Sequence, residues 1–408
     1  MKLSAWKTIT AAAIAIALAN TVAAAETNQD LLKRLDEQQK QIDSLKKQVE
    51  AAVEATEASD TASASKSSFG GYGELHYGSY DKTAPDSHSG NADRTKALDF
   101  HRFVLFFGHQ FDEKVRFFSE LEIEHSLAGE GKRGEVELEQ AFIEYTVNDS
   151  FSWKGGLLLM PVGIINETHE PPTFYGVERN RVEGDIIPST WWEGGAGTTF
   201  RFADGLALDT TITSGLFTDG SFNLRNGRQK VSKASADSLA YTGRLKWTAI
   251  PGLEVAGSLQ YQEDLLQGRG VTANAAEEAS AVLAEAHVAW QIGGFDLRAL
   301  YAQWDIDSSV AKTANKEKQS GWFIEPGYRF TDMFGVFVRY SNWDNGGFTT
   351  INGLGTFANQ DKESVQFGIN VWVHPHVVVK ADYEHLTGEA IDGSKDDKGF
   401  NLGVGYHF

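Results

Sequence analysis

Apolar and polar side chains alternate with a period of two from residue 69 to the C-terminus. In the last segment Phe400, Leu402, Val404, Tyr406 and Phe408 alternate with glycine and polar residues. Such alternation predicts strands with one apolar and one wet face. The sixteen predicted strands are 69–80, 96–111, 114–127, 134–147, 151–162, 191–202, 205–216, 236–249, 253–264, 281–292, 294–305, 318–330, 333–343, 362–374, 376–388 and 397–408.

The connections between these segments alternate between tight turns and longer polar loops. Asp112-Glu113 and Gly293-Gly294 are tight, whereas 217–235 and 344–361 are long. This arrangement is typical of a transmembrane up-and-down barrel with its short turns in the periplasm. Closure of the sheet leaves no backbone edge unpaired in lipid. We therefore predict an all-β fold, a 16-stranded antiparallel transmembrane β-barrel, over residues 69–408.

The residues before the barrel follow other patterns. Residues 1–25 have two lysines, a short apolar run and a small-residue end, which predicts a signal peptide; a retained anchor is the alternative. Residues 59–68 are a small, polar linker. Between them, 26–58 predicts an α-helical coiled coil, either a homotrimeric periplasmic stalk or a solvated helix. Its seam is Leu31, Leu35, Gln38, Ile42, Leu45, Val49 and Ala52.

Composition and charge exclude several classes of protein. The 408 residues contain no cysteine, so disulfides and thiolate metal sites are impossible. Glycine (41) far exceeds proline (8) and aromatics reach 12%, which indicates sheets and turns. The formal net charge of −19 becomes −21 when 1–25 is removed with its two lysines. An acidic chain of this kind does not favour a nucleic-acid partner.

Charged residues on the predicted wet faces indicate a water-filled interior. A soluble sandwich could not place so many charges in an apolar core, whereas a barrel of sixteen strands is too wide for side chains to fill. We therefore predict that these side chains line a pore. On the strands, they include Arg116, Glu120, Glu122, Arg244, Arg298, Arg329, Arg339 and Lys380.

The longest connection, 163–190, contains three prolines and mixed charges. A long loop in a compact fold is usually functional, and one folded into so wide a pore would constrict it. The alternative is an outward surface loop. The predicted constriction residues of this loop are His169, Glu170, Glu178, Arg179, Arg181 and Glu183.

The residues 155–192 (GGLLLMPVGIINETHEPPTFYGVERNRVEGDIIPSTWW) and 138–145 (LEQAFIEY) resemble the phosphate-selective porin O and P family. The resemblance implies a sixteen-stranded trimeric outer-membrane porin with its third loop in the channel. It also places a basic pair on the second strand of phosphate-selective members. The matching residues here are His101 and Arg102, and histidine is mostly neutral at pH 7.

We therefore expect a bacterial outer-membrane porin for passive diffusion of small hydrophilic solutes and ions, with an anion- or phosphate-selective porin as the alternative. The expected partners are a homotrimer, outer-membrane lipid or lipopolysaccharide, and small ions and solutes. A coiled-coil binding module is the non-transport alternative.

Two groups of aromatic residues support this expectation. The terminal Phe408 resembles the assembly signal of outer-membrane proteins, and aromatic residues on both faces of 96–111 indicate a subunit interface.

Motifs for enzyme or metal chemistry are not found. His169-Glu170 lacks the second histidine of an HExxH helix, and His374 and His376 flank a proline in a tight turn. No GxSxG motif occurs. The sequence therefore predicts neither an enzyme nor a cofactor or metal site.

Overall fold

The structure is a computed structural model that describes residues 66–81, 96–129, 133–203, 205–270, 277–351, 355–358, 361–388 and 396–408. The predicted signal peptide (1–25) and coiled coil (26–58), and most of the predicted linker, lie outside these residues. In the described part of the chain, no helix is both long and apolar enough to cross a membrane.

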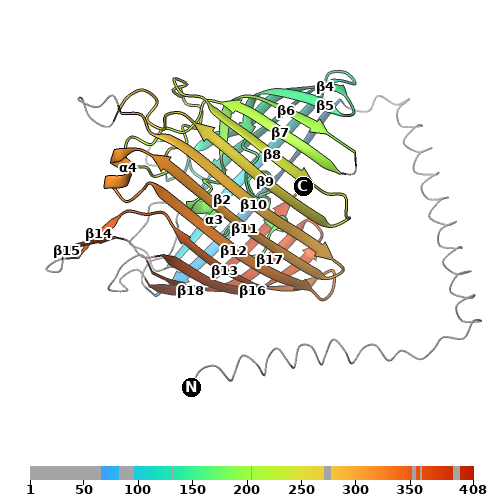
Figure 1. The fold of residues 1–408 in the computed structure, drawn as a ribbon. Coiled ribbons are helices and arrows are strands. Elements are labelled where there is room, and N and C mark those ends of the chain that lie inside the picture. The colour runs from blue at the N-terminus through green and yellow to red at the C-terminus, as the bar shows by residue number, and fades with distance from the viewer. Residues whose placement is uncertain are drawn as a thin grey trace, which may run out of the picture. The chain divides into compact units, whose positions relative to one another are not determined.

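Sixteen antiparallel strands of the described chain form one closed barrel, as the alternating pattern predicts (Figure 1). Each strand pairs with its neighbours in sequence, and β1 closes the ring on β18. The barrel strands are β1 (Ser67–Tyr80), β2 (Lys96–Gln110), β3 (Val115–Glu124), β4 (Val136–Asn148), β5 (Phe151–Leu159), β6 (Trp192–Arg201), β7 (Leu206–Thr213), β8 (Ala240–Trp247), β9 (Leu253–Gln262), β10 (Ser280–Ile292), β11 (Phe295–Asp307), β12 (Lys318–Arg329), β13 (Phe334–Asp344), β16 (Lys362–His374), β17 (Val377–Thr387) and β18 (Asp397–His407).

The long connections carry secondary structure that the period of two does not predict. The connection between β5 and β6 contains the 3₁₀ turn η1 (Pro171–Thr173) and the short helix α3 (Val182–Asp185). Helix α4 (Ser309–Thr313) follows β11, and a hairpin of β14 (Phe348–Ile351) and β15 (Gly355–Ala358) lies between β13 and β16. All three connections belong to the end of the barrel opposite the tight turns, which we call the long-loop end.

Several predicted strands are longer than the observed ones, and in two of them side-chain hydrogen bonds take the place of strand pairing. Strand β7 ends at Thr213 rather than 216, since the N–H of Leu216 donates to Gln262 Oε1 (2.9 Å). Strand β8 begins at Ala240 rather than 236, since the N–H of Ser238 donates to Gln267 Oε1 (2.9 Å). Buried glutamines thus satisfy backbone groups that a strand would otherwise pair.

The ladder between β1 and β18 closes the barrel, and Phe408 extends it by one residue. The N–H of Phe408 donates to the carbonyl of Gly71 (2.8 Å), and the N–H of Gly71 donates to the carbonyl of Phe408 (2.9 Å). The Phe408 ring also contacts Phe69 and Phe103 on β1 and β2, with centroids 6.2 and 6.4 Å apart. Closure leaves no sheet edge on the barrel, which is the condition for strands to lie in lipid.

The two faces of the wall differ as a membrane barrel requires. Apolar side chains such as Val338, Phe367 and Val404 are 40–52% exposed on the outside. On the inside, the apolar cluster formed by Trp191, Trp304 and their neighbours is fully buried under the long loops. The interior therefore contains packed loops as well as charged side chains.

We expect the substitution Val338→Arg to destabilise the barrel by about 2–4 kcal/mol, because Val338 lies at the middle of β13 on the outer face. The matched control is Phe330→Arg, since Phe330 is 64% exposed just beyond β12, where an arginine costs about 0–1 kcal/mol. Urea unfolding in lipid vesicles measures both. Equal losses for the two variants would contradict a lipid-facing position of Val338.

Candidate functional site

The connection from β5 to β6, residues 160–191, crosses the barrel interior and binds the far wall. Arg181 forms a two-point ion pair with Glu384 on β17, at 2.7 and 3.0 Å. Nearby, Lys380 donates to the carbonyls of Phe174 (3.0 Å) and Gly176 (2.7 Å). We call residues 160–191 the inner loop, because its contacts lie on inward-facing side chains of strands far from β5 in sequence.

The base of the inner loop is fixed by Asn166. Its side-chain amide donates to the carbonyls of Met160 (2.8 Å) and Trp191 (2.9 Å), and its Oδ1 accepts from the N–H of Trp191 (2.7 Å). Within the loop, the carboxylate of Glu183 accepts the N–H groups of Ile164 (2.6 Å) and Ile165 (2.8 Å). Burial raises the pKa of Glu183. These bonds give an irregular segment a defined shape without a ladder.

A narrow cavity of about 40 Å³ lies between the inner loop and the strands β1–β4. A water molecule needs about 10–15 Å³ on the same scale, so this space is small. The lining carries both signs of charge. Its carboxylates are Glu74, Glu122, Glu124, Glu137, Glu139 and Glu178, and its cations are Arg102, Arg179, Arg225, Arg228 and Lys230. We call this cavity the constriction.

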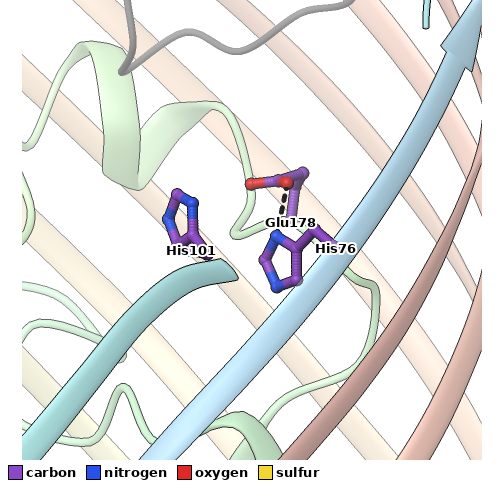
Figure 2. A group of neighbouring side chains, drawn as sticks. All are labelled: His76, His101 and Glu178. Carbon is purple, nitrogen blue, oxygen red and sulfur yellow. Dashed lines mark hydrogen bonds and ion pairs between the residues drawn. The ribbon is translucent and has the colours of Figure 1, made fainter. Parts of the chain in front are cut away.

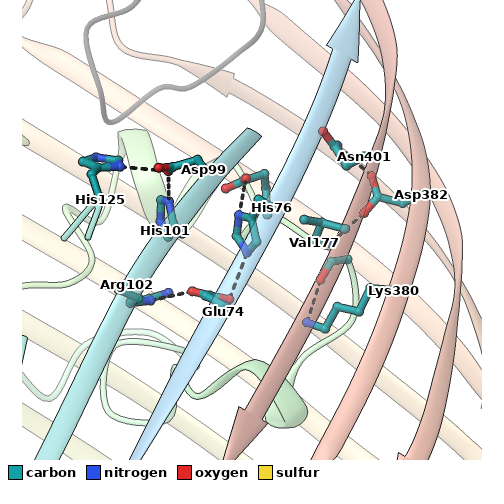
Figure 3. Close-up of polar contacts among 12 residues, drawn as sticks. Glu74, His76, Asp99, His101, Arg102, His125, Val177, Lys380, Asp382 and Asn401 are labelled. Carbon is teal, nitrogen blue, oxygen red and sulfur yellow. Dashed lines mark hydrogen bonds and ion pairs between the residues drawn. The ribbon is translucent and has the colours of Figure 1, made fainter. Parts of the chain in front are cut away.

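Carboxylates of the constriction come mainly from β1, β3 and β4. Two of the constriction carboxylates, Glu74 and Glu178, contact a group of histidines near the long-loop end (Figures 2 and 3). His76 Nδ1 lies 2.8 Å from Glu178 Oε1, and its Nε2 lies 3.0 Å from Glu74 Oε2. The His101 ring stacks on His76 with centroids 4.8 Å apart. Burial would raise the pKa of Glu178, but the positive charge of His76 lowers it to about 2. Glu178 is therefore an anion at neutral pH.

Most cations of the constriction come from the connection between β7 and β8. Arg225 donates to the carbonyls of Gly184 (3.0 Å) and Ser189 (2.7 Å) on the inner loop. Arg228 donates to the carbonyl of Thr190, and Lys230 pairs with Glu135 (2.9 Å). Burial and the neighbouring Arg228 lower the pKa of Arg225 to about 9, which leaves it charged at neutral pH.

These three cations are not among the predicted pore residues, because 217–235 has the composition of an ordinary polar loop. The signal was present in the cluster RNGRQK at 225–230, which is the densest basic segment of the barrel's connections. What the sequence does not contain is the direction of the loop. Its inward position depends on packing of Leu216, Phe222 and Leu224 into the interior apolar cluster.

Four of the predicted pore residues line the constriction directly, namely Arg102, Glu122, Glu178 and Arg179. A second group binds the inner loop to the wall. Arg244 pairs with Glu167 of the loop, Arg298 donates to the carbonyl of Thr173 (2.7 Å), and Arg339 donates to that of Tyr175 (3.1 Å). The members of this second group are Arg181, Arg244, Arg298, Arg339 and Lys380. Of the remaining predicted residues, Glu183 bonds within the loop, and His169 of the loop faces Glu120 of β3 at 3.4 Å.

Three predicted residues lie away from the constriction. Arg116 is half exposed beside the tight turn before β3 and pairs with Glu144 (2.6 Å). Arg329 lies over the Trp372 ring, 3.9 Å from its centroid. Glu170 precedes η1 and accepts the N–H of Thr173 through its carbonyl (2.9 Å). None of the three lines the narrow cavity.

On the tight-turn side the interior widens. A cavity of about 490 Å³ lies between the inner loop and strands β8–β11, with Glu167, Arg244, Lys246, Glu254 and Arg298 in its wall. A cavity of about 230 Å³ continues beneath η1, beside Arg329 and Trp372. The interior on this side of the inner loop is therefore much wider than the constriction.

A sixteen-stranded barrel with a loop folded across its interior is the architecture of an outer-membrane porin. Residues 69–402 match the model of the phosphate-selective porin O and P family, and the chain belongs to this family. An uncharacterised protein of Aquifex aeolicus is 32% identical, over 78% of this chain and 74% of the relative. The family and the fold identify a passive channel of the bacterial outer membrane rather than an enzyme.

Solved porins share the fold at low sequence identity. The anion-selective porin from Comamonas acidovorans is 10% identical with a TM-score of 0.57, over 84% of this chain and 99% of that one. The trimer form of OmpT from Vibrio cholerae is 10% identical with a TM-score of 0.52, over the same 84% and 99%. These likenesses concern the fold alone.

Proposed function

We propose that this porin is a general diffusion channel for small hydrophilic solutes and ions, without strong preference for phosphate. The observation that carries the proposal is the lining of the constriction, where carboxylates of β1, β3 and β4 face cations of the two long loops. A solute that passes between them meets both signs of charge within a few ångströms.

Opposed charges create a field across the passage rather than along it. Such a field orients a dipolar solute, and it presents an attractive wall to either sign of ion. Several of the cations are also neutralised by close partners, as Arg102 is by Glu74 and Lys230 is by Glu135. Paired cations do not form the continuous basic path that strong anion selection needs.

Anion or phosphate selectivity is the second candidate function, and the buried guanidinium of Arg179 favours it. Arg179 donates to Thr190 Oγ1 (2.7 Å), but its Nε and Nη2 are buried without a hydrogen-bond partner among the described residues. Arg179 shares the constriction with Arg225 and Arg228. Three guanidiniums in one small cavity could bind a phosphate oxygen.

We propose further that the porin is a trimer with β2 at the subunit interface. Phe106 on β2 packs inward against Tyr72 and Phe118, whereas Phe107 is 46% exposed on the outer face. The trimer form of one structural neighbour supports this assembly. The predicted coiled coil, 26–58, would associate as a trimer, and lipopolysaccharide would contact the outer face of the barrel.

Planar-bilayer recordings test the proposed function. We expect stepwise ohmic conductance, a reversal potential close to zero in a potassium chloride gradient, and no block of chloride current by millimolar phosphate. The reason is that anions meet as many carboxylates as cations in the constriction. Block by micromolar phosphate would instead establish the second candidate function.

A further inference from the structure

Beneath the inner loop, three buried side chains direct atoms without hydrogen-bond partners at one another. His169 Nε2 lies 3.4 Å from Glu120 Oε1 and 3.5 Å from Glu139 Oε2. The three side chains are 1–4% exposed. Among the described residues, none of the three atoms has a hydrogen-bond partner. Buried polar atoms rarely lack a hydrogen-bond partner, so a group of three that point at one another needs an explanation.

The distances within this cluster fit ligands of a metal ion. A charge-assisted hydrogen bond between a histidine and a carboxylate measures about 2.7–2.9 Å, shorter than both distances here. Two ligands of a tetrahedral ion with bonds of about 2.1 Å lie about 3.4 Å apart. The three atoms are within 4.8 Å of one another, which leaves space for one ion between them.

The surroundings orient the three ligands. His169 Nδ1 lies 3.1 Å from the carbonyl of Asn166, so Nδ1 carries a proton and Nε2 is the nitrogen directed at the cluster, where it can bind a metal when it is unprotonated. Gln140 donates to the second oxygen of Glu120 (2.6 Å), which leaves Oε1 directed at the cluster. Metal-binding histidines and carboxylates in proteins are oriented by such outer contacts.

The other histidine-rich cluster of the barrel differs in this respect. His76, His101, His125, Asp99 and Glu178 contact one another at 2.8–3.2 Å. Those are hydrogen-bond distances, so the side chains of that cluster already have hydrogen-bond partners. The buried cluster is therefore the stronger metal site.

We propose that Glu120, Glu139 and His169 bind one divalent first-row transition-metal ion, of the zinc class. Two carboxylates and one imidazole are ligands that such ions accept, and an imidazole disfavours magnesium or calcium. Glu122, whose Oε2 is also buried without a partner, lies beside Glu139 and can supply a further oxygen. Because Glu122 and Glu139 line the constriction, ions can reach the site from the channel.

The consequence of metal binding is mechanical. Glu120 and Glu139 belong to β3 and β4, whereas His169 belongs to the inner loop just before η1. A bound ion would therefore join the loop to the wall. These side chains form no direct hydrogen bond with one another that would do this without the ion. The inference concerns loop anchoring and holds whether the pore is unselective or anion-selective.

The test uses the full-length folded porin in detergent, stripped with chelator and equilibrated with excess zinc chloride. After gel filtration, mass spectrometry should find about one tightly bound zinc per chain, and zinc should raise the thermal unfolding midpoint. His169→Gln should reduce the affinity at least about tenfold and abolish the shift. The matched control is His385→Gln, because His385 is exposed on β17 outside the interior.

A second variant, Glu120→Gln, tests the same site in case His169→Gln does not fold. Glu120→Gln preserves the shape of the side chain and should also lose zinc. The proposal is overturned if folded wild-type protein does not retain zinc. It is also overturned if His169→Gln and wild type retain equal amounts. Neither measurement depends on conduction, so failure here is distinguishable from failure of the proposed channel function.

Discussion

Replacing Arg225, Arg228 and Lys230 together with glutamine is expected to convert the porin into a cation-preferring channel, with a permeability ratio changed by roughly tenfold. The three side chains supply most of the positive charge of the constriction, and the carboxylates opposite them remain. In so narrow a space each uncompensated charge attracts counter-ions strongly, because little water screens it. The reversal potential in a salt gradient measures the change.

The matched control for this prediction is Lys233→Gln. Lys233 belongs to the same loop but is exposed and does not line the constriction. Its substitution should leave the reversal potential unchanged. A triple variant that keeps the wild-type potential would show that ions pass elsewhere, and the proposed constriction would have to be abandoned.

Arg181→Ala is expected to release the inner loop and raise the mean single-channel conductance severalfold, with larger current fluctuations. Among the described residues, the substitution leaves Glu384, which is 2% exposed, with Tyr80 and Ser364 as partners. Breaking a buried ion pair from one side costs about 3–5 kcal/mol, which is more than a single one of the other hydrogen bonds of the inner loop contributes. The loop should therefore leave the wall at this point while the strands persist.

The control is Lys312→Ala, which removes an ion pair with Asp307 that is exposed to solvent on α4. Surface pairs of this kind contribute little, so conductance should not change. If Arg181→Ala also left the conductance at the wild-type value, the bond to Glu384 would not be what holds the loop. Circular dichroism should show the same strand content in both variants.

Much of the fold could be predicted from the sequence, because a strand between lipid and water must alternate apolar and polar side chains. Strand β16 begins at Lys362 and ends at His374, as the pattern predicts. The connections could not be predicted in the same way. Their backbones are satisfied by individual side chains such as Asn166 and Gln262, and no periodic signal marks such bonds.

The candidate site could be predicted only in part, for a related reason. Side chains alternate between the two faces of a strand, so the sequence predicts that charged residues such as Arg102 and Glu122 point into the pore. Arg225 and Arg228 lie on a loop, where side chains do not alternate regularly between two faces. Only the folding of that loop brings them inward. The meeting of His169 with Glu120 and Glu139 likewise depends on contacts between segments far apart in sequence.

The pairing of β1 with β18 has a consequence for assembly. Until β18 is in place, β1 and β17 each keep a free edge with unpaired backbone groups. Lipid does not satisfy such groups, so a ring without β18 is not stable in a bilayer. Membrane insertion and closure of the ring must therefore be coupled.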